Sequence, residues 1–338
     1  MRHRRRTALA LSLVLSIANC VAEAQSAAGT RRVALIYTTS PVSEMTGPEP
    51  YHWAARTLIR ALSERGWVEG KNLILERRSA EGRPERYEAI LRELLGLKCD
   101  VIITNGTPMA RVAKRVTTTV PIFMQGISDP VLSGLVPNLA RPGGNATGLT
   151  DTGPELDAKR LELLKQGVPR ASRVAVLVAS TMPNPGNITY QNVRQAAAEK
   201  LGLTLVNVEF GPDNYSDGLG VIARERPDAI FSGPSAGLFA LAKHKLIVDF
   251  AARNRIPLMG GDRIFPDSGA LMSYGGDNAD SARATADYID RILGGGNPGG
   301  LPILRPQKFE LVINLQTARA LGLTIPESLL VRANNVIR

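Results

Sequence analysis

Short apolar runs alternate with segments of helical spacing along almost the whole chain after residue 30. In the first half, runs rich in Val, Ile and Leu predict buried strands at 32–37, 72–77, 100–104 and 121–124. Between them, apolar residues three or four positions apart predict helices at 53–65, 83–95 and 108–116, and then a short helix or turn at 129–138. This alternation is typical of an α/β fold with helices on both faces of a parallel sheet.

The same alternation starts again at residue 173. Strands are predicted at 173–178, 203–209, 228–231 and 256–259, with helices at 190–201, 215–226 and 239–254. Two such series in one chain predict two doubly wound, Rossmann-like lobes, each built on a parallel sheet. About 314 residues without the leader also exceed what one hydrophobic core usually organises.

The tail leaves two topologies open. It contains further predicted strands at 269–274 and 308–313 around a helix at 278–293. These elements either extend the second lobe, or return to the first lobe and cross back, which would make a three-segment hinge. We expect the second arrangement, with residues 30–148 and 275–300 in the first lobe and residues 149–274 and 301–338 in the second. The turn-rich segment 141–148 approaches the first crossing.

The first 24 residues have the organisation of a secretory signal peptide. Four arginines precede an apolar run at 8–18, and Ala22 and Ala24 are the small residues expected before a cleavage site. The run is shorter than the roughly 20 residues that span a bilayer, so we expect cleavage and a periplasmic protein. A short membrane anchor is the alternative, and lipid attachment at Cys20 is less favoured because Asn19 precedes it.

Charge and cysteine content narrow the class of protein. Cleavage removes four Arg and one Glu, leaving 37 basic and 30 acidic residues and a net charge of +7. These charges are scattered, whereas nucleic-acid binders usually gather them on one face, so no nucleic-acid partner is expected. Cys99 would be the one remaining cysteine, which rules out an internal disulfide, and its apolar neighbours predict a small buried hydrophobe.

Catalytic patterns are present only in incomplete form. Gly233–Gly237 matches the nucleophile elbow G-x-S-x-G around Ser235, but no histidine follows His244, nine residues further on, so a hydrolase triad in the usual order cannot be assembled. A G-x-G-x-x-G match at 294–299 follows a helix and contains a proline, unlike a dinucleotide site. We therefore expect no catalytic residue, cofactor or metal site, and place His52 and His244 on helix surfaces. An exported hydrolase using Ser235 remains the alternative.

Polar and aromatic residues follow the predicted strands, where ligands bind in open α/β sheets. The expected polar contacts are Ser40, Asn105, Thr107, Asp129, Ser180, Ser235 and Asp262. Asp129 could pair with an amine, and Ser40 and Thr107 could hold a carboxylate at a helix start. The expected packing surfaces are Tyr37, Trp53 and Tyr274. The alternative is that each small polar residue only caps its own helix.

Several longer runs resemble one known family. They include GWVEGKN at 66–72, LARPGGNATG at 139–148 and KFELVIN at 308–314, with shorter matches at 79–83, 129–130, 159–165, 271–275 and 321–326. The chain is similar to the substrate-binding proteins of a bacterial ABC-transporter family in the type I periplasmic binding-protein superfamily, which includes tryptophan- and tyrosine-type receptors.

The resemblance implies two lobes that close about a three-segment hinge on a small ligand. The ligand would be an amino acid or an aromatic or carboxylate compound, and the partner a permease in the inner membrane that receives it from a monomeric receptor. A ligand-sensing module for a membrane sensor kinase would use the same closure and stays open. A DNA-binding regulator is disfavoured, because a leader stands where a helix-turn-helix would be.

Overall fold

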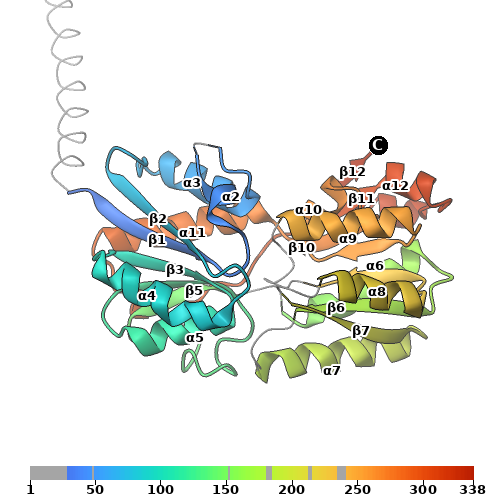
Figure 1. Cartoon of the computed structure of the whole chain (residues 1–338), viewed down its shortest axis with the longest axis horizontal. Coiled ribbons are helices and arrows are strands. Elements are labelled where there is room, and N and C mark those ends of the chain that lie inside the picture. Colours follow the sequence, from blue (N-terminus) through green and yellow to red (C-terminus); the bar gives the residue numbers. More distant parts are fainter. Residues whose placement is uncertain (1–28, 48, 151–152, 180–184, 212–214, 234–240) are drawn as a thin grey trace, which may run out of the picture.

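The computed structural model describes residues 29–47, 49–150, 153–179, 185–211, 215–233 and 241–338, which form two α/β lobes side by side (Figure 1). The first lobe holds a five-stranded parallel sheet in the order β2-β1-β3-β4-β5. Its strands are β1 (Arg31–Tyr37), β2 (Leu73–Ser79), β3 (Val101–Asn105), β4 (Ile122–Ile127) and β5 (Ala146–Thr150).

Helices cover both faces of this sheet, because the inward residues of each strand alternate between two apolar clusters. On one face lie α4 (Tyr87–Gly96), preceded by the 3-10 turn η1 (Pro84–Arg86), and α5 (Thr107–Val116). Cys99 lies in this cluster, 5 % exposed, as the apolar run around it predicts. On the other face lie α3 (Trp53–Glu64) and α11 (Asn278–Leu293), with the short α2 (Val42–Met45) nearby.

The second lobe holds a seven-stranded sheet in the order β12-β11-β10-β9-β8-β6-β7. Its strands are β6 (Arg173–Ala179), β7 (Thr204–Phe210), β8 (Ala229–Ser232), β9 (Leu258–Gly260), β10 (Met272–Gly276), β11 (Phe309–Asn314) and β12 (Asn335–Ile337). One face is covered by α6 (Glu155–Gly167), α7 (Pro185–Lys200), α12 (Leu315–Ala320) and α13 (Glu327–Leu330). The other is covered by α8 (Tyr215–Glu225), α9 (Leu241–Arg253) and the short α10 (Ile264–Asp267).

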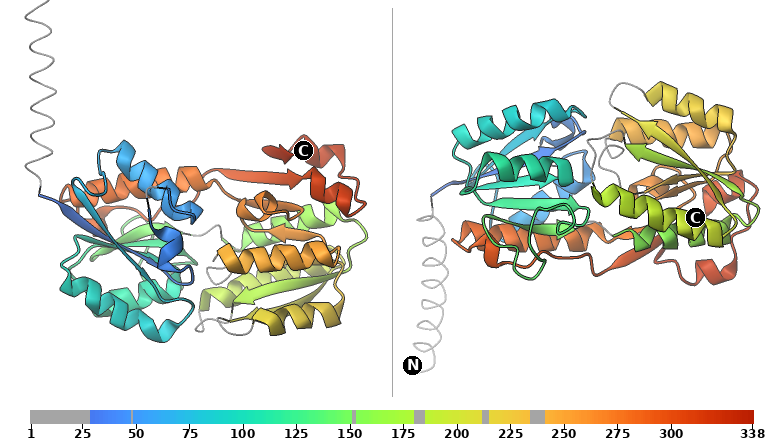
Figure 2. Two further views of the ribbon diagram at one scale, coloured as in Figure 1. Left: turned by 45° about the horizontal axis from the view of Figure 1, so that its top comes forward. Right: turned by 90° about the horizontal axis from the view of Figure 1, so that it is seen from below.

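The chain passes between the lobes three times. It leaves the first sheet after β5 and enters α6; it returns after β10 to form α11, which packs on α3; and it crosses back after η3 (Pro298–Gly300) to form β11. Because β11 arrives from the first lobe, it runs antiparallel to β10, and β11 and its parallel neighbour β12 run opposite to the other five strands of the sheet. Figure 2 shows α11 and β11 in line along one side of the molecule.

Two features differ from the sequence expectations in a way that matters for the site. Helix α6 and strand β5 were not predicted, because α6 buries two charged residues that blur its apolar periodicity, and β5 overlaps the turn-rich segment 141–148. The prediction that His52 and His244 lie on helix surfaces is wrong, because these residues are only 5 % and 0 % exposed. Both pack against aromatic rings, Tyr37 and Phe265 respectively.

Candidate functional site

The carboxyl ends of the parallel strands in the two sheets face each other. In the first lobe the chain crosses to the second directly after β5, so its strands run toward the second lobe. In the second lobe β11 runs away from the first lobe and β10 is antiparallel to it, so the parallel strands run toward the first lobe. The two edges where open α/β sheets bind ligands therefore lie opposite each other.

Each sheet also has a switch point at this edge. Reading from β2 to β5 and from β7 to β10, both orders are second, first, third, fourth, fifth, so successive connections leave the first strand in opposite directions. The switch points lie between β1 and β3 and between β6 and β8, and ligands bind at such points. Ser180 and Ser235, expected after β6 and β8, lie outside the described residues.

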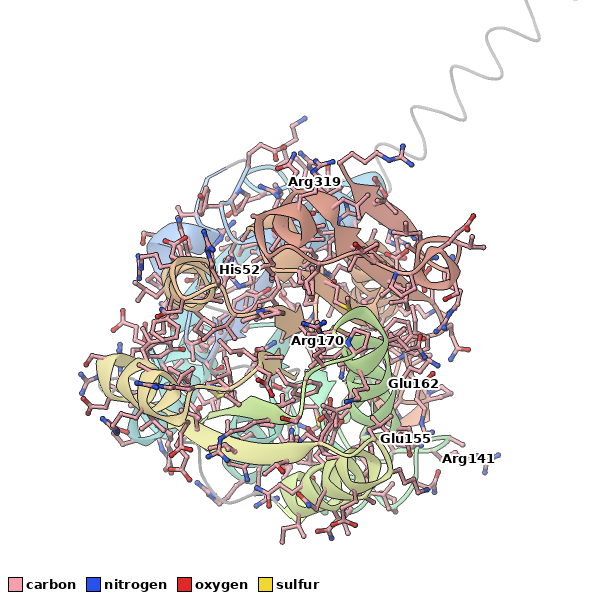
Figure 3. All side chains as sticks on the ribbon, turned by 90° about the vertical axis from the view of Figure 1, so that its right-hand side faces the viewer. His52, Arg141, Glu155, Glu162, Arg170 and Arg319 are labelled. Atoms are coloured by element: carbon pink, nitrogen blue, oxygen red, sulfur yellow. The ribbon has the colours of Figure 1, made fainter. Side chains whose placement is uncertain are left out.

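An aromatic cluster stands at the switch point of the first lobe. Tyr37 ends β1 and is 5 % exposed, and its ring centroid lies 4.4 Å from that of His52. The His52 ring is stacked at 6.2 Å on Trp53, the first residue of α3. His52 (labelled in Figure 3) also caps α3, because its Nδ1 accepts a hydrogen bond from Ala55 N at 3.4 Å. The site therefore brings together two expected residues and one that the sequence analysis missed.

The cluster is uncharged. Burial lowers the pKa of His52 to about 4, and a nitrogen that accepts from a backbone N–H must be unprotonated. Burial also raises the pKa of Tyr37, and no charged neighbour contributes to either shift. This edge of the first lobe therefore offers neutral donors and ring faces.

Four buried polar atoms at the same edge have no hydrogen-bond partner among the residues that the structure describes. They are Tyr37 Oη, Thr38 Oγ1, Trp53 Nε1 and Thr104 Oγ1. Each such atom costs about 1–3 kcal/mol if it stays unpaired, and folded proteins leave few of them. Unpaired polar atoms clustered around the β1/β3 switch point are expected where a polar ligand binds and supplies the missing partners.

The other expected residues of the first lobe take different places. Ser40 is 1 % exposed in the loop after β1, and Asn105 is half-buried at the end of β3. Thr107 is buried at the start of α5, and its Oγ1 accepts from Ser128 N at 3.0 Å. Asp129 is exposed with φ +32°, and its Oδ1 accepts from Leu132 N at 2.9 Å. Asp129 thus organises its own turn.

Asp262 and Tyr274 lie in the second lobe, close to a crossing segment. Asp262 is 9 % exposed and accepts from Ile264 N at 3.0 Å and, with both oxygens, from Asn278 Nδ2 at 3.1 Å. Burial raises the pKa of Asp262, although these hydrogen bonds oppose the shift. Because Asn278 begins α11, this contact joins a second-lobe loop to a helix of the first lobe. Tyr274, half-buried in β10, has its ring 6.1 Å from Phe309.

A buried ionic network in the second lobe was not anticipated. Asp157 and Arg160 of α6 and Arg194 of α7 are 1 %, 0 % and 8 % exposed. Asp157 accepts from Arg160 Nη1 at 2.8 Å and from Arg194 Nη1 at 3.1 Å, one guanidinium on each oxygen. A Cβ added at Gly233, just after β8, would lie 3.4 Å from Asp157 Oδ1, so the network borders the β6/β8 switch point. Figure 3 shows α6, labelled at Glu155 and Glu162, beside the second sheet.

Arg160 joins α6 to strand β10 and to the loop after β9. Its Nε donates to Tyr274 O at 2.6 Å and its Nη2 to Gly261 O at 3.4 Å. The i,i+3 spacing of Asp157 and Arg160 was the one signal in the sequence, and it carries weight only once α6 is known to be buried.

The described residues include no group of three or more His, Cys, Asp or Glu side chains placed to hold a metal ion. His244 lies on α9 with Nε2 2.9 Å from Ser268 Oγ. In the same part of the chain, every helix is too short or too polar to cross a bilayer.

Comparison with known proteins agrees with this architecture. A tyrosine-binding protein of Clostridioides difficile (strain R20291) is 27 % identical over 272 residues, which cover 80 % of this chain and 76 % of that protein. A conserved domain protein of Vibrio cholerae superposes with a TM-score of 0.78 at 28 % identity, over 91 % of this chain and 99 % of that one. The ABC domain from Streptococcus pneumoniae in complex with L-Trp superposes with a TM-score of 0.77 at 25 % identity, over 91 % and 100 %.

The family described as ABC transporter substrate binding protein matches residues 51–337, nearly the whole of the described chain. The fold, the facing switch points and this match agree, and the chain belongs to the ABC transporter substrate binding protein family.

Proposed function

We propose that this protein is the extracytoplasmic receptor of an ABC importer. It captures a small organic solute between its lobes, closes about the three crossing segments, and delivers the solute chemically unchanged to a permease in the inner membrane. The observation that carries this proposal is that the two switch-point edges face each other in a member of a substrate-binding family. A periplasmic location after cleavage of residues 1–24, a monomeric state and no nucleic-acid partner belong to the same proposal.

The ligand class that we propose is an amino acid or an aromatic or carboxylate compound. Two relatives, described as a tyrosine-binding protein and a domain in complex with L-Trp, support it. The aromatic cluster of Tyr37, His52 and Trp53 supports it as well, because ring faces and neutral donors suit a planar organic guest.

The direct test is to identify what the natively exported protein carries. We expect mass spectrometry of the denatured protein to release a small amino or aromatic acid, and titration calorimetry with L-tryptophan, L-tyrosine and benzoate to find at least one tight binder. A ligand at 100 times its Kd should stabilise the fold by about 2.7 kcal/mol, readable as a rise in Tm. Tight binding only of a sugar or an inorganic ion would overturn the ligand class.

We propose further that no bond is broken at this site. We expect the wild-type protein to show no ester or amide hydrolysis above background. Replacing Ser235, the nucleophile of the hydrolase alternative, by Ala should therefore change nothing. A hydrolytic activity that disappears in Ser235→Ala would overturn the receptor assignment.

A further inference from the structure

Arg194 has hydrogen-bonding capacity that the described residues leave unused. The residue is buried, with 8 % of its surface exposed, and its guanidinium carries five N–H donors. Among the described residues it makes one hydrogen bond, from Nη1 to Asp157 Oδ2 at 3.1 Å, and its Cζ lies 6.0 Å from the centre of the Phe231 ring. Burying a guanidinium costs free energy unless acceptors pair with its remaining N–H groups.

Its surroundings hold the guanidinium in one orientation. Asp157 cannot turn freely toward Arg194, because its other oxygen accepts from the fully buried Arg160, which is itself anchored on Tyr274 O and Gly261 O. On the strand side, the guanidinium carbon lies over the Phe231 ring, 6.0 Å from its centre. A guanidinium held on one side by an anchored carboxylate keeps N–H groups available for a second planar acceptor.

The guanidinium also lies at the correct edge of the second lobe. Helix α7 follows β6, so it starts at the edge that faces the first lobe, and helical side chains tilt toward the helix start. Arg194 therefore reaches toward that edge, where its partner Asp157 borders Gly233 beside the β6/β8 switch point. In contrast, the aromatic cluster at the opposite edge is uncharged.

We infer that Arg194 is the anion-binding residue of the solute site and takes the carboxylate of the ligand through its unused N–H groups. Asp157 and Arg160 are positioning residues that hold it. The ligand then has a fixed polarity: its carboxylate lies against the second lobe and its apolar or ring portion against Tyr37, His52 and Trp53 of the first. This inference rests on the proposed receptor function and names the chemistry of its site.

The test compares paired solutes with and without a carboxylate. Calorimetry on the full exported protein would use L-tryptophan against tryptamine, L-tyrosine against tyramine, and benzoate against benzyl alcohol. The wild-type protein should prefer the carboxylate member, and Arg194→Gln should weaken that member by about 10- to 100-fold while changing the other little. Arg194→Lys, which keeps the charge but loses the planar fork, should recover only part of the affinity.

Controls separate this role from a structural one. Arg224→Gln on α8 removes an exposed arginine of the same lobe and should leave every Kd unchanged. Asp157→Asn should weaken binding of the carboxylate member and make its binding enthalpy less favourable, because Arg194 is no longer held. Thermal melts of each variant establish that the Kd values refer to folded protein, since loss of global stability alone does not alter Kd below the Tm.

The outcomes are distinct. An Arg194→Gln protein that is folded at the assay temperature and binds the carboxylate member with wild-type Kd overturns the inference. Tight binding of a solute without any anionic group, unaffected by Arg194→Gln, overturns it too but leaves the receptor function standing. No bound solute in the native protein and no binder in the panel would overturn both.

Discussion

At the scale of single residues, His52 shows how a side chain can be structural and functional together. Its Nδ1 caps α3, its ring lies between Tyr37 and Trp53, tilted against the first and stacked on the second, and burial keeps it neutral. A histidine before a helix is not a favoured N-cap, so the sequence contained no strong signal for this role. The neighbouring Tyr37, at the end of a predicted strand, and Trp53, at the start of a predicted helix, were both expected to pack against the ligand.

The lowered pKa of His52 predicts a pH dependence of stability. Histidine in the unfolded chain has a pKa near 6.5, whereas His52 in the folded protein has a pKa of about 4. Between these pH values the unfolded chain therefore binds one proton more than the folded protein. The contribution of neutral His52 to the free energy of unfolding is therefore complete above about pH 6.5. It falls by about 3 kcal/mol in all as the pH drops toward 4. Urea unfolding between pH 4 and 7.5 measures it.

The matched control for this prediction is His52→Asn, which keeps a capping side chain but does not titrate. Its free energy of unfolding should fall less steeply with decreasing pH than that of the wild-type protein, and the difference between the two curves isolates the histidine. Parallel curves would show that His52 does not titrate with the shifted pKa.

At the scale of elements, the alternating pattern predicted the strands of both sheets except β5 and β12, and the long helices except α6. β5 and α6 failed for different reasons. Strand β5 ends a run of turn formers, and Gly148 within it faces β4 so closely that an added Cβ would lie 2.0 Å from Met124 O. In α6, Asp157 and Arg160 are buried where a periodic pattern would place apolar residues. Sequence spacing alone cannot show that distant charges neutralise each other.

The docking of α11 on α3 depends on the turn after α3. Trp67 Nε1 donates to Asp290 Oδ1 at 2.8 Å, and Arg65 Nε donates to Asp287 Oδ1 at 2.7 Å. Trp67→Phe keeps an aromatic ring but loses the donor, so we expect a loss of about 0.5–1.5 kcal/mol in the free energy of unfolding. A double-mutant cycle with Asp290→Ala in guanidinium chloride should show coupling; additive effects would show that the hydrogen bond contributes nothing.

The approach of β10 to the loop that carries Asp262 requires a residue without a side chain. A Cβ on Gly275 would lie 2.2 Å from Gly261 O, so Gly275→Ala must displace that backbone and cost about 1–3 kcal/mol. Gly300→Ala is the control, because a Cβ there would have no atom within 4 Å. Thermal unfolding should lower the Tm for Gly275→Ala only. Equal Tm values would mean that the loop gives way without cost.

At the scale of the whole molecule, two lobes and a return of the tail to the first lobe could be anticipated from the sequence, but the buried ionic network of the second lobe could not. Its ionic groups come from α6 and α7, and their relation to Tyr274 and Gly261 exists only after the chain has folded. Ser180 and Ser235 lie outside the described residues, and their role stays a prediction.

Closure of the lobes predicts a change in overall dimensions. Small-angle X-ray scattering with the tightest solute found by calorimetry should show a smaller radius of gyration than the solute-free protein, because closure draws the lobes together. Arg194→Gln at the same solute concentration should keep the larger value. An unchanged radius at saturation would contradict hinge closure.

The route of α11 has a consequence for the order in which the protein can be completed. This helix covers one face of the first sheet, yet its last residue is Leu293, after five of the seven strands of the second lobe have been made. Until then Leu35, Leu58 and Phe123 lack part of their cover, and no contiguous segment of the chain consists of one complete lobe alone. During synthesis, the lobe that begins first must wait for the other, and a truncation before residue 278 leaves both unfinished.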